Sequence, residues 1–165
     1  AFTVTGCARV KITGGGKLDN GTTKSTFAVN ANSCKSDADG NAVVKGNLTY
    51  VDKSAALVPN GGGLKLKGEI TGAAECDVLG DQVELGCIIC IFYGYDLYVT
   101  FDYTSTNPFY PGTGTGVVCA TDNGEGSGAL PDDAAIALFG GVYGGYLNVG
   151  VIQGNIQQHE CKADE

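Results

Sequence analysis

Residues 1–12, Ala-Phe-Thr-Val-Thr-Gly-Cys-Ala-Arg-Val-Lys-Ile, alternate between two faces without interruption. One face carries the apolar positions Phe2, Val4, Ala8, Val10 and Ile12. A period of two is typical of a β-strand buried on one face, and twelve residues would span about 40 Å. Because most strands have only five or six residues, we expect the apolar face of this strand to be covered either by its own domain or by a neighbouring copy of the chain.

The composition argues against helices. Glycine accounts for 27 of 165 residues, and it costs up to about 1 kcal/mol in a helix interior while suiting turns and bulges. Further strand-like runs follow the first one, at residues 25–29, 42–52, 64–70, 83–93, 95–103, 117–121, 134–139 and 146–156. The sequence therefore predicts an all-β fold, a β-sandwich or jelly roll of about nine strands.

Turn signals separate these runs. We expect turns at residues 14–16, 19–21 and 60–63 and loops at 30–41 and 107–116. Residues 83–93 are nearly all apolar, which favours a central strand buried on both faces. No repeat or domain boundary is visible, so the organisation we predict is a candidate donor strand at 1–12 followed by a single β-sandwich domain at 13–165.

Seven cysteines in a chain of this size indicate an oxidising compartment. The candidates for disulfides are Cys7, Cys34, Cys76, Cys87, Cys90, Cys119 and Cys161. The sequence does not choose among the pairings, and the odd cysteine is either free or joined to another chain. If residues 83–93 form a strand, Cys87 and Cys90 point to opposite faces, and we expect them to bridge different partners.

Secretion, to the extracellular space or the cell surface, is the predicted localisation. The chain begins with Ala and contains no Met, as expected of a mature form without its signal peptide. Asn20 and Asn47 stand in N-x-S/T sequons and are candidate glycosylation sites. Residues 134–158 carry no charge, but their glycines and amides favour strands over a membrane span.

Charge is distributed unevenly along the chain. Residues 1–70 sum to +4 and residues 71–165 to −12, within a total of −8. One interpretation is an acidic surface that keeps the protein in solution; another is head-to-tail contact between copies, or cation binding on the acidic half. No basic stripe indicates a nucleic-acid partner.

Catalytic motifs are poorly represented. The one histidine, His159, stands close to Cys161, and no nucleophile elbow, zinc-binding histidine pair or phosphate loop is present. A glycine run at 112–116 lacks the spacing and the following helix of a nucleotide-binding fingerprint. We therefore predict that the protein is not an enzyme.

Calcium is the cofactor that the sequence makes most plausible. Oxygen donors alternate around a glycine turn at Asp37, Asp39 and Asn41, as they do in calcium loops. A second acidic loop carries Asp122, Asn123 and Glu125. The alternative for each is a solvated turn.

Aromatic residues concentrate in one region. Eight of the fourteen lie between residues 92 and 110. Such a cluster either packs in the core or forms a platform on which sugar rings stack.

Three short segments carry a family resemblance. They are Leu-Thr-Tyr-Val-Asp at 48–52, Thr-Asp-Asn-Gly-Glu-Gly-Ser-Gly at 121–128 and Gly-Asn-Ile-Gln at 154–157. Together they resemble a β-rich module of secreted and cell-surface bacterial proteins, often a C-terminal appendage. The resemblance spans about residues 14–159 and implies a non-catalytic extracellular role. This chain departs from the module in its cysteines, its insert at 87–95 and its N-terminal strand.

The leading hypothesis is a secreted structural subunit that assembles head to tail into an extracellular filament by β-strand addition. Residues 1–12 would complete a sheet of the next copy, a contact that generates an open-ended homopolymer. Three alternatives remain: residues 1–12 pair within their own domain, the chain is a monomeric carbohydrate- or surface-binding module, or it is a hydrolase that uses His159.

Overall fold

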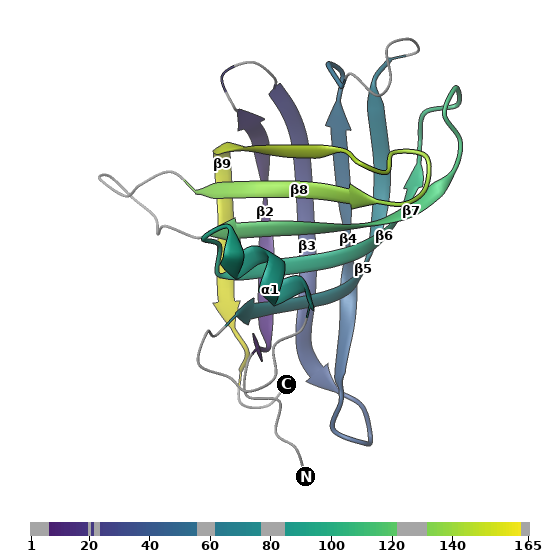
Figure 1. Cartoon of the computed structure of the whole chain (residues 1–165). Helices are drawn as coiled ribbons and strands as arrows, with labels where there is room; N and C mark the ends of the chain where they lie inside the picture. Colours follow the sequence, from purple (N-terminus) through teal and green to yellow (C-terminus); the bar gives the residue numbers. More distant parts are fainter. Residues whose placement is uncertain are drawn as a thin grey trace.

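The computed structural model describes residues 7–19, 21, 24–55, 62–76, 85–121 and 132–162. Within these ranges the chain forms nine strands and one short helix (Figure 1). The elements are β1 (Cys7–Ala8), β2 (Val10–Asp19), β3 (Lys24–Ser36), β4 (Ala42–Asp52), β5 (Leu64–Cys76), α1 (Leu85–Phe92), β6 (Leu97–Ser105), β7 (Thr113–Thr121), β8 (Asp133–Phe139) and β9 (Leu147–Glu160). The all-β prediction is confirmed.

The strands form one antiparallel sheet that closes on itself. The order is β1-β5-β4-β3-β2-β9-β8-β7-β6, and β6 pairs again with β5. Eight strands therefore make a closed barrel, with β1 added beside the end of β5. The prediction of a sandwich or jelly roll is wrong, because the pairing of β5 with β6 joins what would be the two outer edges of an open sheet.

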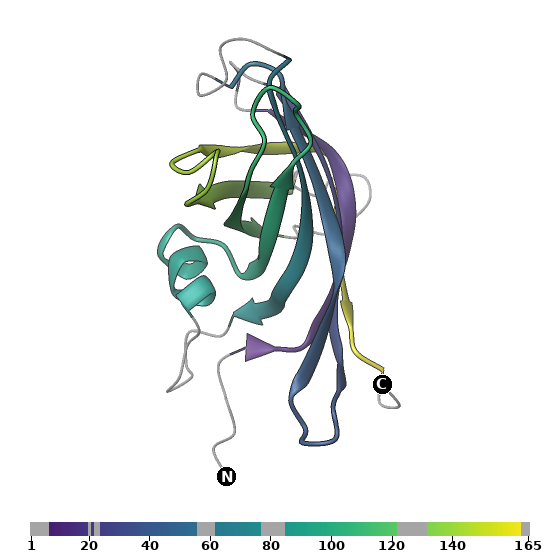
Figure 2. The same cartoon turned by 90° about the vertical axis from the view of Figure 1, so that its right-hand side faces the viewer.

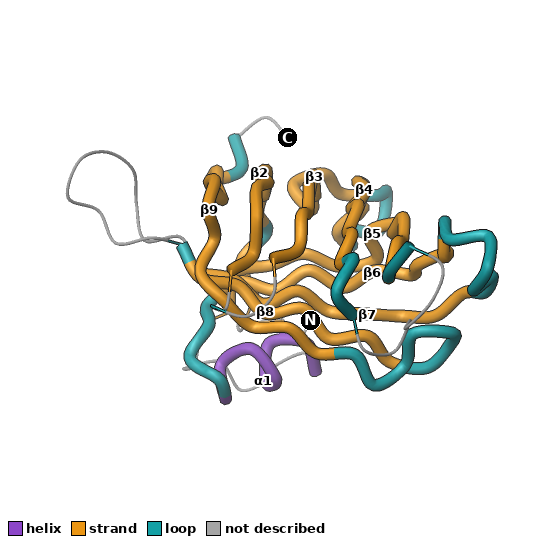
Figure 3. Tube along the Cα trace, turned by 90° about the horizontal axis from the view of Figure 1, so that it is seen from above, coloured by secondary structure: helices purple, strands orange, loops and turns teal. Residues whose placement is uncertain are grey.

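The barrel has two halves that cross at a steep angle. Strands β2, β3 and β4 run along one direction, and β7 and β8 cross in front of them (Figure 1). Strand β9 belongs to both halves, since residues 147–151 pair with β8 and residues 151–160 pair with β2. The bend near Val151 lets one strand turn the corner between the halves, as the view from above also shows (Figure 3).

The barrel interior is filled by side chains. Alternate positions of the strands point inward, and they build one continuous core whose largest fully buried members include Tyr50, Tyr103, Phe101 and Leu66. Tyr143, from the connection between β8 and β9, joins this core. An eight-stranded barrel is just wide enough for side chains to fill it. The interior is thus a packed core.

Several strand glycines provide space for these large rings. A Cβ on Gly116 would lie 2.5 Å from Cζ of Phe101 and 2.8 Å from Leu138, and one on Gly68 would lie 2.8 Å from the same Phe101 ring. Since Gly116 faces Phe101 across the β6–β7 pair, the aromatic ring occupies the volume that a side chain would need. The high glycine content therefore reflects packing as well as turns.

Residues 14–16 differ from the prediction of a turn. They lie inside β2, where both β3 and β9 pair with them. A Cβ on Gly16 would meet the carbonyl oxygen of Gln153 and the backbone of Gly154. Gly16 and Gly154 both have φ near +150°, so this part of the sheet brings two backbones together at a conformation that favours glycine.

The N-terminal strand is shorter than predicted and, where it is described, belongs to its own barrel. Ala8 pairs with Glu75 of β5. After a break at Arg9, Val10 and Ile12 in β2 pair with β9 and are 1% and 2% exposed. The expectation that 1–12 leaves the domain as one donor strand is therefore wrong for residues 7–12. Phe2 and Val4 lie outside the described residues.

The apolar run at 83–93 also differs from the prediction. Residues 85–92 form α1 instead of a central strand, because a continuous apolar run fits a buried helix as well as a buried strand. Two expected loops are partly strand, since β3 continues to Ser36 and β7 begins at Thr113. The boundaries of β4 match the predicted 42–52.

Replacing Gly116 by valine tests the packing of the barrel interior. We expect Gly116→Val to lower the free energy of unfolding by about 2–3 kcal/mol, because the new side chain overpacks the Phe101 ring. Urea unfolding of the purified protein measures this. The control is Thr104→Val on the exposed face of β6, which should change stability by less than about 0.5 kcal/mol; equal effects of the two variants would contradict the packing account.

Candidate functional site

The outer face of β7, β8 and β9 is apolar where a barrel strand normally carries polar side chains. Inward positions such as Val118, Ile136 and Leu138 belong to the core. Eight outward positions are also apolar: Val117, Cys119, Ala135, Ala137, Phe139, Leu147, Val149 and Val151. Polar outward residues, Thr115, Thr121 and Asp133 among them, lie toward the strand ends. Antiparallel sheets with one solvated face usually carry polar residues at such positions, so the apolar stretch is unusual.

Helix α1 covers part of that face. It lies on the outside of the barrel beside β6 and β7 (Figures 2 and 3). Cys90 of α1 is fully buried and forms a disulfide with Cys119 of β7, with their Cα atoms 5.2 Å apart. Around this bond a second, smaller cluster packs Tyr98 and Val117 against Ile89. The disulfide therefore anchors the helix on the strand face.

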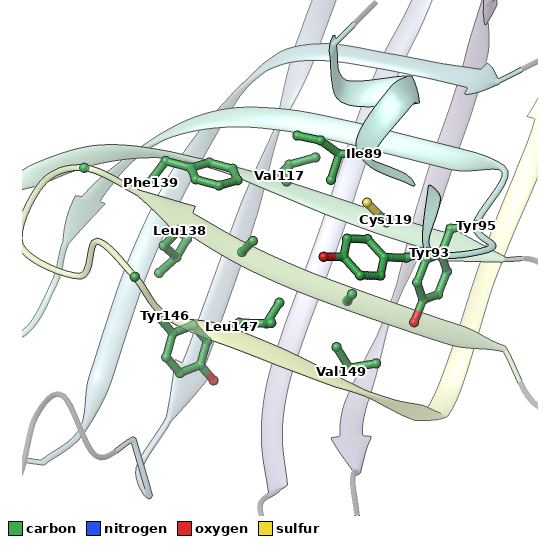
Figure 4. A pocket seen from close by; sticks show the side chains of 14 residues that line it. Ile89, Tyr93, Tyr95, Val117, Cys119, Leu138, Phe139, Tyr146, Leu147 and Val149 are labelled. Atoms are coloured by element: carbon green, nitrogen blue, oxygen red, sulfur yellow. The ribbon is translucent and has the colours of Figure 1, made fainter. Parts of the chain in front are cut away.

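A groove remains between α1 and the strands that the helix does not reach. It has a volume of about 660 Å³, within the roughly 300–1,000 Å³ range of small-molecule sites. Ile89, Tyr93 and Tyr95 border it on the helix side and Leu147 and Val149 on the β9 side (Figure 4). Outward residues of β7 and β8 line the groove between these borders. Among the described residues, no Lys, Arg, Asp or Glu lines the groove.

Large apolar side chains are exposed on the groove and beside it. Exposure is 80% for Phe92, 69% for Tyr93 and 63% for Leu147. Phe139, Val149 and Val151 are each more than two-fifths exposed. We call these six side chains the apolar face; single apolar residues are normal on a protein surface, whereas several large ones on and beside one groove mark an interaction site. The apolar face is therefore a candidate interaction surface.

Charge separates the two halves of the barrel. Strands β2 to β5 carry seven lysines, while β6 to β9 carry no Lys or Arg and three acidic residues. One of these three acidic residues is Asp133 of β8. Burial first, and then the charge of Asp133, raise the pKa of Tyr95 above its ordinary value. The groove thus lies on the acidic half of the molecule.

A buried polar network lies inside the barrel. The Tyr146 hydroxyl donates to Oδ2 of Asp52 at 2.6 Å and lies 2.5 Å from the Tyr50 hydroxyl. Nδ2 of Asn148 donates to the Tyr50 hydroxyl at 3.0 Å. Asp52 is only 2% exposed and also accepts two hydrogen bonds from Ser54. Because a buried carboxylate is costly without such donors, this network is structural.

The histidine of the hydrolase alternative, His159, has an exposed position. His159 lies on β9 opposite Lys11, with Nε2 3.4 Å from the hydroxyl of Thr13. Within the described part of the chain, no three His, Cys, Asp or Glu side chains gather in a way that could hold a metal ion.

The first predicted calcium loop is the tip of the β3–β4 hairpin. Oδ1 of Asp37 accepts hydrogen bonds from the backbone N–H groups of Asp39 and Asn41, each at 2.9 Å. Such bonds are typical of an aspartate that stabilises a turn. Asp122, Asn123 and Glu125 lie outside the described residues.

The structure also describes one of the two predicted glycosylation sites and several of the cysteines. Asn47 is exposed on β4, and Asn20 lies outside the described residues. Cys34 pairs with Cys161, with 5.3 Å between Cα atoms, and thereby joins β3 to the segment after β9. These bonds indicate an oxidising environment. No helix among the described residues is long and apolar enough to cross a membrane.

The aromatic cluster at 92–110 is divided between core and surface. Tyr98, Phe101 and Tyr103 are buried, whereas Phe92, Tyr93 and Phe109 are exposed. The alternation of apolar and polar residues at 95–103 places Phe101 and Tyr103 on the core face, whereas Tyr98 lies on the other face and is buried in the cluster around Cys90. The apolar face was missed because both faces of β7 and β8 are apolar, a pattern also expected of a central strand.

Comparisons with known proteins give no match: no family model, no curated protein and no solved structure is significantly similar to this chain.

The tyrosine network predicts a loss of stability at high pH. Burial is the main reason why the pKa values of Tyr50 and Tyr146 lie above 10 in the native protein. The unfolded chain releases these protons near pH 10 while the native state keeps them, so stability is present below pH 10 and falls above it, by about 1.4 kcal/mol per pH unit for each such tyrosine.

Urea unfolding at pH 9, 10 and 11 measures this slope. Tyr146→Phe should flatten it, and should cost about 1–3 kcal/mol at pH 7 because the Asp52 carboxylate loses a donor. The control is Tyr93→Phe, which removes an exposed hydroxyl and should change neither quantity. Parallel pH profiles for the wild type and Tyr146→Phe would contradict the role of the network.

Proposed function

We propose that this protein is a non-catalytic structural subunit of an extracellular, oxidising compartment whose copies assemble head to tail into a filament. The observation that supports this best is the apolar face beside α1, whose six large apolar side chains are each more than two-fifths exposed. Association with another protein chain would remove these side chains from water.

The occupant that we infer for the groove is the segment 1–6 of a neighbouring copy. This segment has no charged side chain, and its apolar Phe2 and Val4 alternate with Thr3 and Thr5. It thereby matches the groove, whose described lining is mostly apolar and carries no charged side chain. Alternate side chains of an extended segment that enter pockets provide the specificity of strand-type recognition.

The position of this segment in the chain favours an open-ended assembly. Residues 1–6 precede β1, which pairs with β5, whereas the groove lies on β7, β8 and β9. Donor segment and acceptor groove are thus different parts of one chain, and a contact of this kind forms filaments when its rotation does not close a ring. The lysines of β2–β5 and the acidic residues of β6–β9 would help to orient successive copies.

This mechanism differs from strand addition at a sheet edge. Strands β7 and β8 already pair on both sides, so the groove offers side-chain pockets in place of an edge. Residues 42–46 of β4 pair with β3 alone, but Lys45 in this stretch is the kind of charge that protects an edge. We therefore assign the acceptor role to the groove.

Glycan binding is less well supported. Sugars require several hydrogen-bonding groups, and the side chains of the groove provide little beyond the hydroxyls of Tyr93 and Tyr95. The Tyr146 hydroxyl is directed to Asp52.

Deleting residues 1–6 and, separately, replacing Leu147 by glutamate test the proposal. We expect each change to convert filaments of the purified protein into monomers, because the first removes the donor and the second places a charge in the apolar groove. Negative-stain electron microscopy and sedimentation velocity measure assembly. Phe109→Glu is the matched control, since Phe109 is 74% exposed outside the groove, and it should leave assembly unchanged.

Two results would overturn the proposal. One is a wild-type protein that stays monomeric at concentrations of hundreds of micromolar. The other is a deletion variant that still assembles while Leu147→Glu does not, which would mean that the apolar faces of two copies pack directly on each other.

A further inference from the structure

The register of β1 on β5 places two cysteines opposite each other. Cys7 is the partner of Cys76, and Ala8 is the partner of Glu75. Residues directly opposite in an antiparallel pair have Cα atoms about 4.5–5.5 Å apart. Disulfides need about 4.4–6.8 Å between Cα atoms, so this backbone arrangement suits a disulfide without any movement of the strands.

The other cysteines leave few alternatives. Cys34 is bonded to Cys161 and Cys90 to Cys119. Three of the seven cysteines then remain: Cys7, Cys76 and Cys87. Cys87 lies in α1, whereas Cys7 and Cys76 are already register partners in the sheet.

We propose that Cys7 and Cys76 form a third disulfide and that Cys87 is the single thiol of the chain. In the step, two thiols lose two protons and two electrons as one S–S bond forms. The electrons pass to a disulfide oxidant, which is reduced to two thiols; oxidised glutathione serves in vitro. This inference does not depend on the proposed function.

The bond would stabilise the N-terminal end of the barrel. Strand β1 has only two residues and is separated from β2 by Arg9. It is joined to the sheet by its pairing with β5. A covalent bond to β5 would keep residues 7 and 8 on the sheet, and it would restrict the unfolded chain by closing a long loop.

Peptide mapping by mass spectrometry without reduction tests the inference. The protein is refolded with oxidised and reduced glutathione, denatured, alkylated with iodoacetamide and digested. We expect one alkylated cysteine, Cys87, a peptide pair joining Cys7 to Cys76, and an unalkylated intact mass about 6 Da below that of the fully reduced chain, two hydrogens for each bond. Cys87→Ser should abolish alkylation and keep all three bonds.

Cys7→Ser makes the assignment specific, because it should expose Cys76 as a second alkylated site while the other two disulfides persist. A peptide joining Cys87 to Cys7 or to Cys76, or alkylation of both Cys7 and Cys76 in the wild type, would overturn the inference.

Discussion

Pairing between β5 and β6 closes the sheet, and the rest of the molecule depends on it. With this pair formed, the strands from β2 to β9 each have neighbours on both sides. The core is then enclosed, and Phe101 and Tyr103 of β6 fill it above glycines of the adjacent strands. Because inward positions already build a complete core, apolar residues at outward positions are not needed for it.

This surplus of apolar surface explains the helix and the groove. Helix α1 and the Cys90–Cys119 bond cover outward residues of β6 and β7. Outward residues of β8 and of the first part of β9 stay half-buried or exposed, and the aromatic rings of Phe92 and Tyr93 extend the apolar face from the helix side. An apolar surface that the fold leaves exposed is available for association. In our account, assembly covers the part of the apolar face that α1 leaves exposed.

The sequence predicted what depends on local pattern. Alternation identified an all-β chain and the limits of β4, and the uncharged stretch at 134–158 was rightly interpreted as strands. Closure was not predictable, because the β5–β6 and β2–β9 pairs join distant segments. The helix at 85–92 was not predicted, because a continuous apolar run has no period that distinguishes a helix from a strand. The glycines at 14–16 were interpreted as a turn, because the sequence alone does not show that they allow β2 to approach β9 closely.

The candidate site could be predicted only in part, because it too is built from segments that are distant in the sequence. Alternation selected Phe2, Val4, Val10 and Ile12 alike as donor-strand residues. The structure shows what alternation does not, that Val10 and Ile12 are buried in their own barrel. The groove needs outward residues of three strands and a helix in one place, which no single segment reveals.

The central claim is that copies of the chain meet at the apolar face. Hydroxyl-radical footprinting of the wild type, diluted and concentrated, tests it most directly by mass spectrometry of the oxidised side chains. The account predicts that oxidation of Tyr93, Phe139 and Leu147 falls several-fold on concentration while that of Phe109 stays constant. Equal oxidation of Tyr93, Phe139 and Leu147 in dilute monomer and in assembled protein would contradict it.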